Sequence, residues 1–114
     1  MTRVELLNSL IRLDRASFLE TFQQEIVSFA WDVDKPLVQL KISDITALID
    51  RVIQAKLSLE TIWLWAEYIE SREDIEFDPI YEDKIKSCIF QLANSELSGI
   101  RTVDDLISLR GEFV

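Results

Sequence analysis

The sequence contains no histidine, one cysteine, two glycines and two prolines among its 114 residues. The absence of histidine excludes the Ser/His/Asp and Cys/His catalytic arrangements, histidine-ligated zinc or haem, and imidazole acid-base chemistry. Because hairpin turns depend on glycine and proline, so few of them provide too little turn chemistry for an all-β fold. We therefore predict a helical protein that is not an enzyme and holds no metal and no cofactor.

The single cysteine indicates the kind of cellular compartment, and the charge balance limits the classes of partner. Cys88 alone can form neither an intrachain disulfide nor a four-cysteine metal site, which favours a reducing compartment and predicts a cytoplasmic location. No apolar run approaches the roughly 20 residues of a membrane span, and the first residues lack the apolar core of a signal peptide. A net charge of -9 argues against nucleic acid, since phosphate binding requires clustered lysine and arginine. We expect neither a membrane nor a nucleic acid as partner.

Capping residues and apolar spacings of three and four divide the chain into five or six short helices. The predicted helices cover about 3–12, 18–31, 44–53, 59–71, 79–93 and 103–110, after the caps Thr2, Ser17, Ser43, Ser58, Asp78 and Thr102. The pattern also allows the first two to run on as one bent helix. Residues 32–42 are predicted to connect two helices, and 38–42 alternate as an extended segment does. The fold class is therefore all-α, a single compact domain over residues 1–114 with an orthogonal or bundle-like arrangement.

The predicted helix 59–71 is apolar on two sides, so we expect it to lie centrally. Its main apolar face consists of Ile62, Trp63, Ala66 and Ile69, and a second group consists of Leu64, Trp65 and Tyr68. Trp63 is predicted to belong to the core. The pattern leaves two positions open for Trp65, the core or a surface that faces a partner.

The negative charge is concentrated in one segment. Residues 1–56 hold 7 basic and 8 acidic residues, whereas residues 57–114 hold 5 and 13. Residues 67–83, here called the acidic segment, contain eight acids and one base, Arg72, for a net charge of -7. The eight acids are Glu67, Glu70, Glu73, Asp74, Glu76, Asp78, Glu82 and Asp83.

Two interpretations of the acidic segment involve no bound ion. Its carboxylates can be solvated, with those near the helix start at Pro79 stabilised by the positive end of that helix. Alternatively, the segment can be a docking surface, because concentrated like charges steer a basic protein toward it. Catalysis by one of these acids would require its burial beside apolar side chains in a deep pocket, where its pKa is raised.

A third interpretation is a cation site. Asp74, Glu76 and Asp78 alternate as the first ligands of an EF-hand loop do. The rest of that motif is missing, because Pro79 stands where the loop has glycine and Ile85 where it has a bidentate glutamate. The sequence therefore favours no metal here.

The order of these signals resembles a pattern of small, mostly uncharacterised bacterial all-α proteins. The matching pieces are residues 57–60 (Leu-Ser-Leu-Glu), 65–67 (Trp-Ala-Glu), 77–79 (Phe-Asp-Pro), 91–94 (Gln-Leu-Ala-Asn) and 102–106 (Thr-Val-Asp-Asp-Leu). Glycine commonly stands near Lys56 or Leu57 in that pattern, and this chain has none there. Some proteins of this kind are supposed to be immunity or antitoxin proteins, and the resemblance implies no established activity and no catalytic residue.

We therefore expect a non-catalytic protein-binding module of the immunity or antitoxin kind that docks a basic protein partner through the acidic segment. The carboxylates of this segment would steer the partner, and Trp65 and Tyr68 would anchor it if they are exposed. The residues expected to contact the partner are Glu67, Glu70, Glu73, Asp74, Glu76, Asp78, Trp65 and Tyr68. The alternative is a structural homo-oligomer or complex subunit that packs through the apolar face of helix 59–71.

Overall fold

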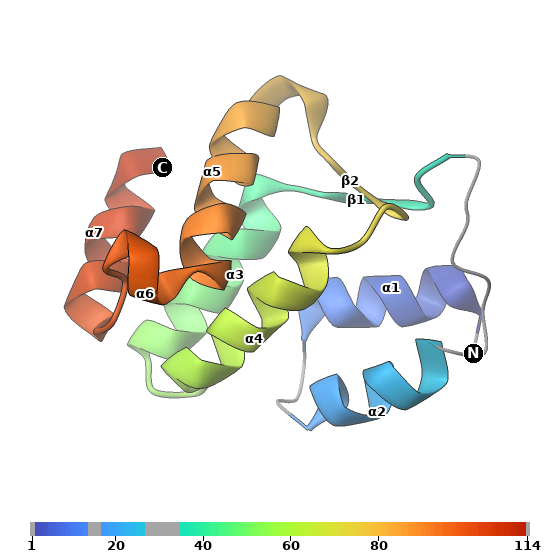
Figure 1. Cartoon of the computed structure of the whole chain (residues 1–114), viewed down its shortest axis with the longest axis horizontal. Coiled ribbons are helices and arrows are strands. Elements are labelled where there is room, and N and C mark those ends of the chain that lie inside the picture. The colour runs from blue at the N-terminus through green and yellow to red at the C-terminus, as the bar shows by residue number, and fades with distance from the viewer. Residues whose placement is uncertain (1, 14–16, 27–34, 114) are drawn as a thin grey trace.

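The computed structural model describes residues 2–13, 17–26 and 35–113, the last of them by its backbone alone (Figure 1). The elements in chain order are α1 (Arg3–Arg12), α2 (Phe18–Ile26), β1 (Val38–Leu40), α3 (Ile42–Ile53), α4 (Leu59–Glu70), β2 (Ile75–Phe77), the 3-10 turn η1 (Pro79–Tyr81), α5 (Glu82–Ala93), α6 (Ser95–Ser98) and α7 (Val103–Phe113). The predicted all-α fold class is confirmed. The Cα radius of gyration, 13.6 Å, is that of a compact chain of this length.

Capping side chains set the start of several helices where the sequence predicts it. The hydroxyl groups of Thr2, Ser58 and Thr102 each accept a hydrogen bond from the backbone amide three residues later, at 3.1, 3.2 and 3.2 Å. These bonds satisfy amides that have no partner within the helix. The predicted starts of α1, α4 and α7 are therefore confirmed, and the end of α5 at Asn94 is confirmed as well.

Other predicted boundaries are wrong. α3 begins at Ile42, two residues earlier than predicted, because the Asp44 carboxylate accepts a 2.9 Å hydrogen bond from the amide of Lys41. α7 continues through Gly111 to Phe113, and α6 is an additional single turn that the sequence does not predict. The part of the predicted helix 18–31 that follows residue 26 lies outside the described residues.

Two short strands pair far apart in the sequence. β1 and β2 run parallel with the register Val38 to Ile75, Gln39 to Glu76 and Leu40 to Phe77. The extended segment predicted near residue 38 is thus confirmed for β1. Residues 75–77, which lie between two predicted helices, are not predicted as a strand, but pairing with β1 holds them as one, with Ile75 buried and Glu76 exposed.

α4 lies between the α1–α2 pair and α5, as Figure 1 shows. Trp65 is fully buried, and its indole nitrogen donates a 2.7 Å hydrogen bond to the carbonyl of Leu10 in α1. Trp63 is partly buried and packs against the core from the other side. The predicted central position of this helix is confirmed. Within the described residues, no helix combines the length and apolarity that crossing a membrane requires.

Candidate docking surface

Asp74 is a buried ion-pair centre, so its place among the surface acids expected to contact a partner is wrong. Only 1% of the residue is exposed. Arg72 binds both carboxylate oxygens, through Nε at 2.7 Å and Nη2 at 2.8 Å, and Nε of Arg3 donates to Oδ2 at 3.1 Å. Burial alone would raise the pKa of Asp74, but the hydrogen bonds and charges of the two arginines outweigh it and lower that pKa below its ordinary value.

The same residue ties several elements together. The backbone carbonyl of Asp74 accepts hydrogen bonds from the amides of Leu37 (2.8 Å) and Val38 (3.3 Å) at the start of β1. The guanidinium carbon of Arg72 lies 5.7 Å from the ring centroid of Phe22 in α2, within the range of a cation–π contact. Asp74 therefore connects α1, α2, β1 and β2, which is a structural role.

These contacts also decide against the cation-site interpretation. Both oxygens of Asp74 are bound by arginine, and Oδ1 of Asp78 accepts from the amide of Ile80 (3.2 Å) to cap η1. In the part of the chain that the structure describes, no group of three metal-ligating side chains occurs. The one acid buried there has a lowered pKa, opposite to the raised pKa that a general acid needs.

The two aromatic residues expected to anchor a partner are used inside the molecule. Trp65 is core, which settles the alternative left open by the sequence and makes its role as an anchor wrong. Tyr68 is half-buried, and its ring stacks on Phe22 with centroids 6.0 Å apart and planes at 29°. Burial, and to a smaller extent the charge of Glu67, raise the pKa of Tyr68. Both side chains therefore attach α4 to α1 and α2.

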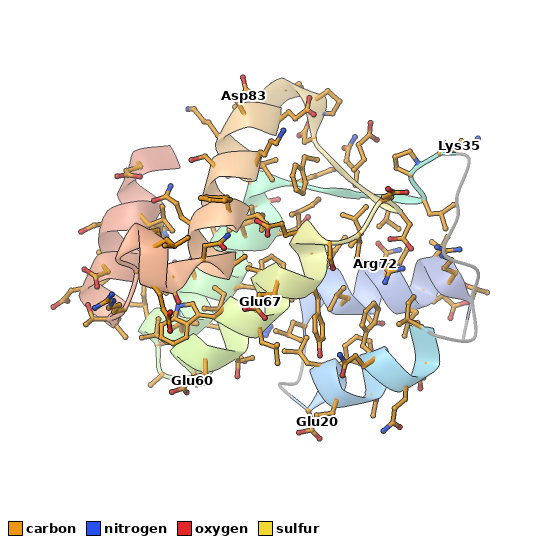
Figure 2. The ribbon with its side chains drawn as sticks, in the orientation of Figure 1. Glu20, Lys35, Glu60, Glu67, Arg72 and Asp83 are labelled. Atoms are coloured by element: carbon orange, nitrogen blue, oxygen red, sulfur yellow. The ribbon has the colours of Figure 1, made fainter. Side chains whose placement is uncertain are left out.

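Most of the remaining acids of the segment are exposed. Asp78 is half-buried, and the exposed acids are Glu67, Glu70, Glu73, Glu76, Glu82 and Asp83. Figure 2 shows Glu67 on α4 and Asp83 at the start of α5, well apart on the molecule. None of the six exposed acids forms an ion pair with another residue of the described ranges. The acidic segment therefore carries unneutralised charge along α4, β2 and α5.

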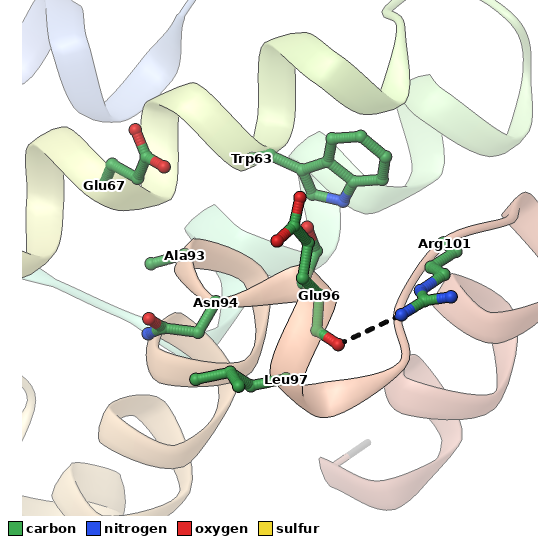
Figure 3. A pocket seen from close by; sticks show the side chains of 8 residues that line it. Trp63, Glu67, Ala93, Asn94, Glu96, Leu97 and Arg101 are labelled. Carbon is green, nitrogen blue, oxygen red and sulfur yellow. Dashed lines mark hydrogen bonds between the residues drawn. The ribbon is translucent and has the colours of Figure 1, made fainter.

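Two hollows lie next to this surface, along the line where α4 packs against α5. The smaller hollow has a volume of about 420 Å³ and is lined by Glu70, Phe77, Asp83, Lys86, Ile89 and Phe90, among others. The larger has a volume of about 890 Å³ and is lined by Trp63, Glu67, Ala93, Glu96, Leu97 and Arg101, among others (Figure 3). In Figure 3, Trp63 and Glu67 extend from α4, and Ala93 on α5 and Leu97 on α6 lie below them in the view.

The two hollows are lined by neighbouring turns of α4 and α5, and together we call them the α4–α5 groove. Glu67 and Glu70 stand three residues apart on α4 and line one hollow each. On the opposite wall, Phe90 and Ala93 stand three residues apart on α5 and do the same. Residues three apart are neighbours on a helix surface, so the hollows abut along both walls.

Sequence reasoning missed the two most accessible apolar residues of this groove. Phe90 is 52% exposed and Leu97 is 83% exposed. A signal exists for Phe90, because it lies off the stripe of Ile85, Ile89 and Leu92 that faces the core. Leu97 sits in a short polar stretch whose single helical turn no periodicity could reveal.

Comparison with protein-family models, with curated proteins and with solved structures finds no match for this chain.

Proposed function

We propose that the protein is a non-catalytic binding module that docks a basic protein partner through the exposed carboxylates of the acidic segment. The observation that carries this proposal is the row of exposed acids without an ion-pair partner among the described residues. Like charges held close together repel each other, and a cationic surface relieves that repulsion while being steered toward it. The contact residues are Glu67, Glu70, Glu73 and Glu76, with Asp78 at the edge.

Neutralisation of a basic toxin is the form of this function that the resemblance to immunity and antitoxin proteins favours. A reducing, cytoplasmic location belongs to the same proposal. It is supported by Cys88, a buried free thiol in a chain that has no second cysteine.

The alternative of a homo-oligomer packed through helix 59–71 loses its main support. Trp65 and Tyr68, which belong to the second apolar group of this helix, are packed against α1 and α2 of the same chain. Leu64 is 40% exposed and is one side chain, not a face. A second copy would also bring a net charge of -9 against the same sign.

Charge neutralisation with a matched control tests the proposal. One variant changes Glu67, Glu70, Glu73 and Glu76 to glutamine, and a control changes Glu20, Glu60 and Glu112 to glutamine and Asp104 to asparagine. All eight residues are exposed, and the two variants have the same net charge. The probe is a disordered lysine-rich peptide, and stopped-flow fluorescence measures its association rate at low and moderate salt.

We expect the first variant to slow association about tenfold at low salt and to flatten the salt dependence, because electrostatic steering changes on-rates by about 10 to 1000-fold. The control should stay within about twofold of the original protein. Equal slowing in both variants would mean that net charge alone attracts the peptide, and would overturn the proposal.

A further inference from the structure

We infer that the α4–α5 groove binds a cationic amphipathic helix of the partner protein, an inference that rests on the proposed function and identifies the partner's binding element. Apolar side chains of that helix would enter the two hollows, and its lysine or arginine side chains would face Glu67 and Glu70.

The apolar wall of the groove supplies the first argument. Phe90 and Leu97 are exposed, and Ala93 lies between them in sequence and lines the larger hollow. Phe90 lies on α5 and lines the smaller hollow, whereas Leu97 lies on α6, after the helix end at Asn94, and lines the larger one. An amphipathic helix presents several apolar residues on one face, at i, i+3 or i+4, and i+7, so its side chains can contact both hollows at once.

The charges of the groove supply the second argument. The residues that line the two hollows include four acids, Glu67, Glu70, Asp83 and Glu96, and two bases, Lys86 and Arg101. Nη2 of Arg101 donates a hydrogen bond of 3.2 Å to the backbone carbonyl of Glu96, so this base is partly engaged within the groove. The groove therefore has a net negative lining that continues into the rest of the acidic segment, and it favours a cationic ligand.

The secondary structure of the walls favours a helix over an extended peptide. An extended peptide gains affinity by pairing its backbone with an exposed strand edge. The groove is walled by α4 on one side and by α5 and α6 on the other, whose backbone groups bond within the helices, and β2 contributes only the side chain of its last residue, Phe77. Side-chain burial and charge remain as the sources of affinity, and these are what an amphipathic helix offers.

A second copy of this chain does not fit the groove. Its net charge of -9 would place like charges against Glu67 and Glu70, with no excess of bases to balance them. A basic partner has the complementary sign. The occupant is therefore another protein, and the same carboxylates that steer it also flank its binding position.

Two peptides and three variants test the inference. The first peptide has about 14 residues, roughly four turns, with leucine at helical spacing on one face and lysine on the other. The second has the same composition in an order without an apolar face. The variants are Phe90→Ser with Leu97→Ser, the neutralised Glu67→Gln with Glu70→Gln, and the control Ile107→Ser on α7. Ile107 is 46% exposed, similar to Phe90, and lies outside the residues that line the groove.

Fluorescence anisotropy measures the dissociation constant of each pair. We expect the amphipathic peptide to bind the original protein about tenfold more tightly than the scrambled one, since burial of exposed phenylalanine and leucine adds to the charge attraction. The Phe90→Ser and Leu97→Ser double variant should lose that advantage, and Ile107→Ser should keep it. The Glu67→Gln and Glu70→Gln variant should weaken the binding of both peptides.

Three outcomes would overturn the inference in distinguishable ways. Equal binding of both peptides, still dependent on the carboxylates, would leave the proposed function standing and remove the groove as a helix site. If neither peptide shows binding that depends on the carboxylates, both the proposed function and the helix site in the groove are overturned. Sedimentation that shows a dimer, lost in the Phe90→Ser and Leu97→Ser variant, would assign the groove to a second copy instead.

Discussion

Asp74 and Glu76 lie two residues apart and have opposite environments. Asp74 is 1% exposed and held by Arg3 and Arg72, whereas Glu76 projects into solvent from the middle of β2. The same chemical group is a structural element in the first case and part of the docking surface in the second. A side chain is therefore assigned to function by its neighbours and not by its charge.

This contrast yields a prediction on stability. Asp74→Asn should lower the free energy of unfolding by about 3 kcal/mol, because it leaves two largely buried guanidinium groups without their counter-charge. The matched control Glu76→Gln should change it by less than about 0.5 kcal/mol, since it removes an exposed charge. Urea unfolding followed by circular dichroism measures both, and a loss of similar size in the two variants would contradict the assignment.

The pH dependence follows from the lowered pKa of Asp74. In the unfolded chain an aspartate has a pKa of about 3.9, and the folded value lies below it. The stabilisation is therefore fully present above the unfolded pKa and is lost as the pH falls through the folded one. The difference between the original protein and Asp74→Asn should stay constant from about pH 5 to 8 and shrink below about pH 4.

Cys88 provides a prediction on reactivity. Burial, with a smaller contribution from the charge of Glu112, raises the pKa of Cys88 to about 12. The thiol is therefore protonated and inaccessible at pH 8, and Ellman's reagent should label it only after unfolding. The control places the thiol one residue earlier, by Ser87→Cys with Cys88→Ala, where the side chain is exposed and should react at once. Rapid labelling of the native protein would contradict the buried position.

At the scale of single elements, the sequence predicts features that depend on nearby residues and misses features that depend on residues far apart in the chain. The caps at Thr2, Ser58 and Thr102 depend on a bond that spans three residues, so the sequence places them correctly. β2 depends on pairing with a strand that ends 35 residues before it begins, and the burial of Asp74 depends on Arg3, 71 residues away. The residue pattern of the acidic segment alone therefore predicts neither the pairing of β2 nor the burial of Asp74.

The double apolar character of α4 shows the same limit. The pattern predicts correctly that two sides are covered, because apolar residues occur on both. It does not decide which tryptophan lies deepest, since that depends on an acceptor from α1, the carbonyl of Leu10. The α4–α5 groove was missed for a related reason. It forms only because the side of α4 that carries Glu67 lies next to the side of α5 that carries Phe90.

The turn between α3 and α4 gives a prediction at this scale. Ala55 is exposed and has φ of 61°, in the left-handed region that disfavours side chains other than glycine. Ala55→Gly should raise the free energy of unfolding by up to about 1 kcal/mol, because glycine adopts this conformation without steric cost. The control Ala47→Gly, at an exposed position inside α3, should lower it by about 1 kcal/mol. Destabilisation by both changes would contradict the turn geometry.

For the whole molecule, the structure changes what the net charge of -9 means. Asp74 and Arg72 neutralise each other in the interior, so the other seven acids account for the whole charge of -7 of the acidic segment. Six of those seven are exposed, and they lie on α4, on β2, in the loop between them and at the start of α5. Repulsion among them should therefore lower the stability of the free protein, and salt should screen that repulsion more than it screens the buried ion pair.

The variants that test the docking surface also test this balance without any partner. Between about 20 and 300 mM sodium chloride, we expect the free energy of unfolding of the original protein to rise by about 1 kcal/mol. The variant with Glu67, Glu70, Glu73 and Glu76 changed to glutamine should start higher at low salt and gain less, whereas the control with Glu20, Glu60, Asp104 and Glu112 changed should keep most of the salt dependence. Equal salt dependence in both would mean that the repulsion is spread over the whole surface. A basic partner would then relieve no repulsion that is specific to the acidic segment. This result would contradict the proposal that the partner docks there.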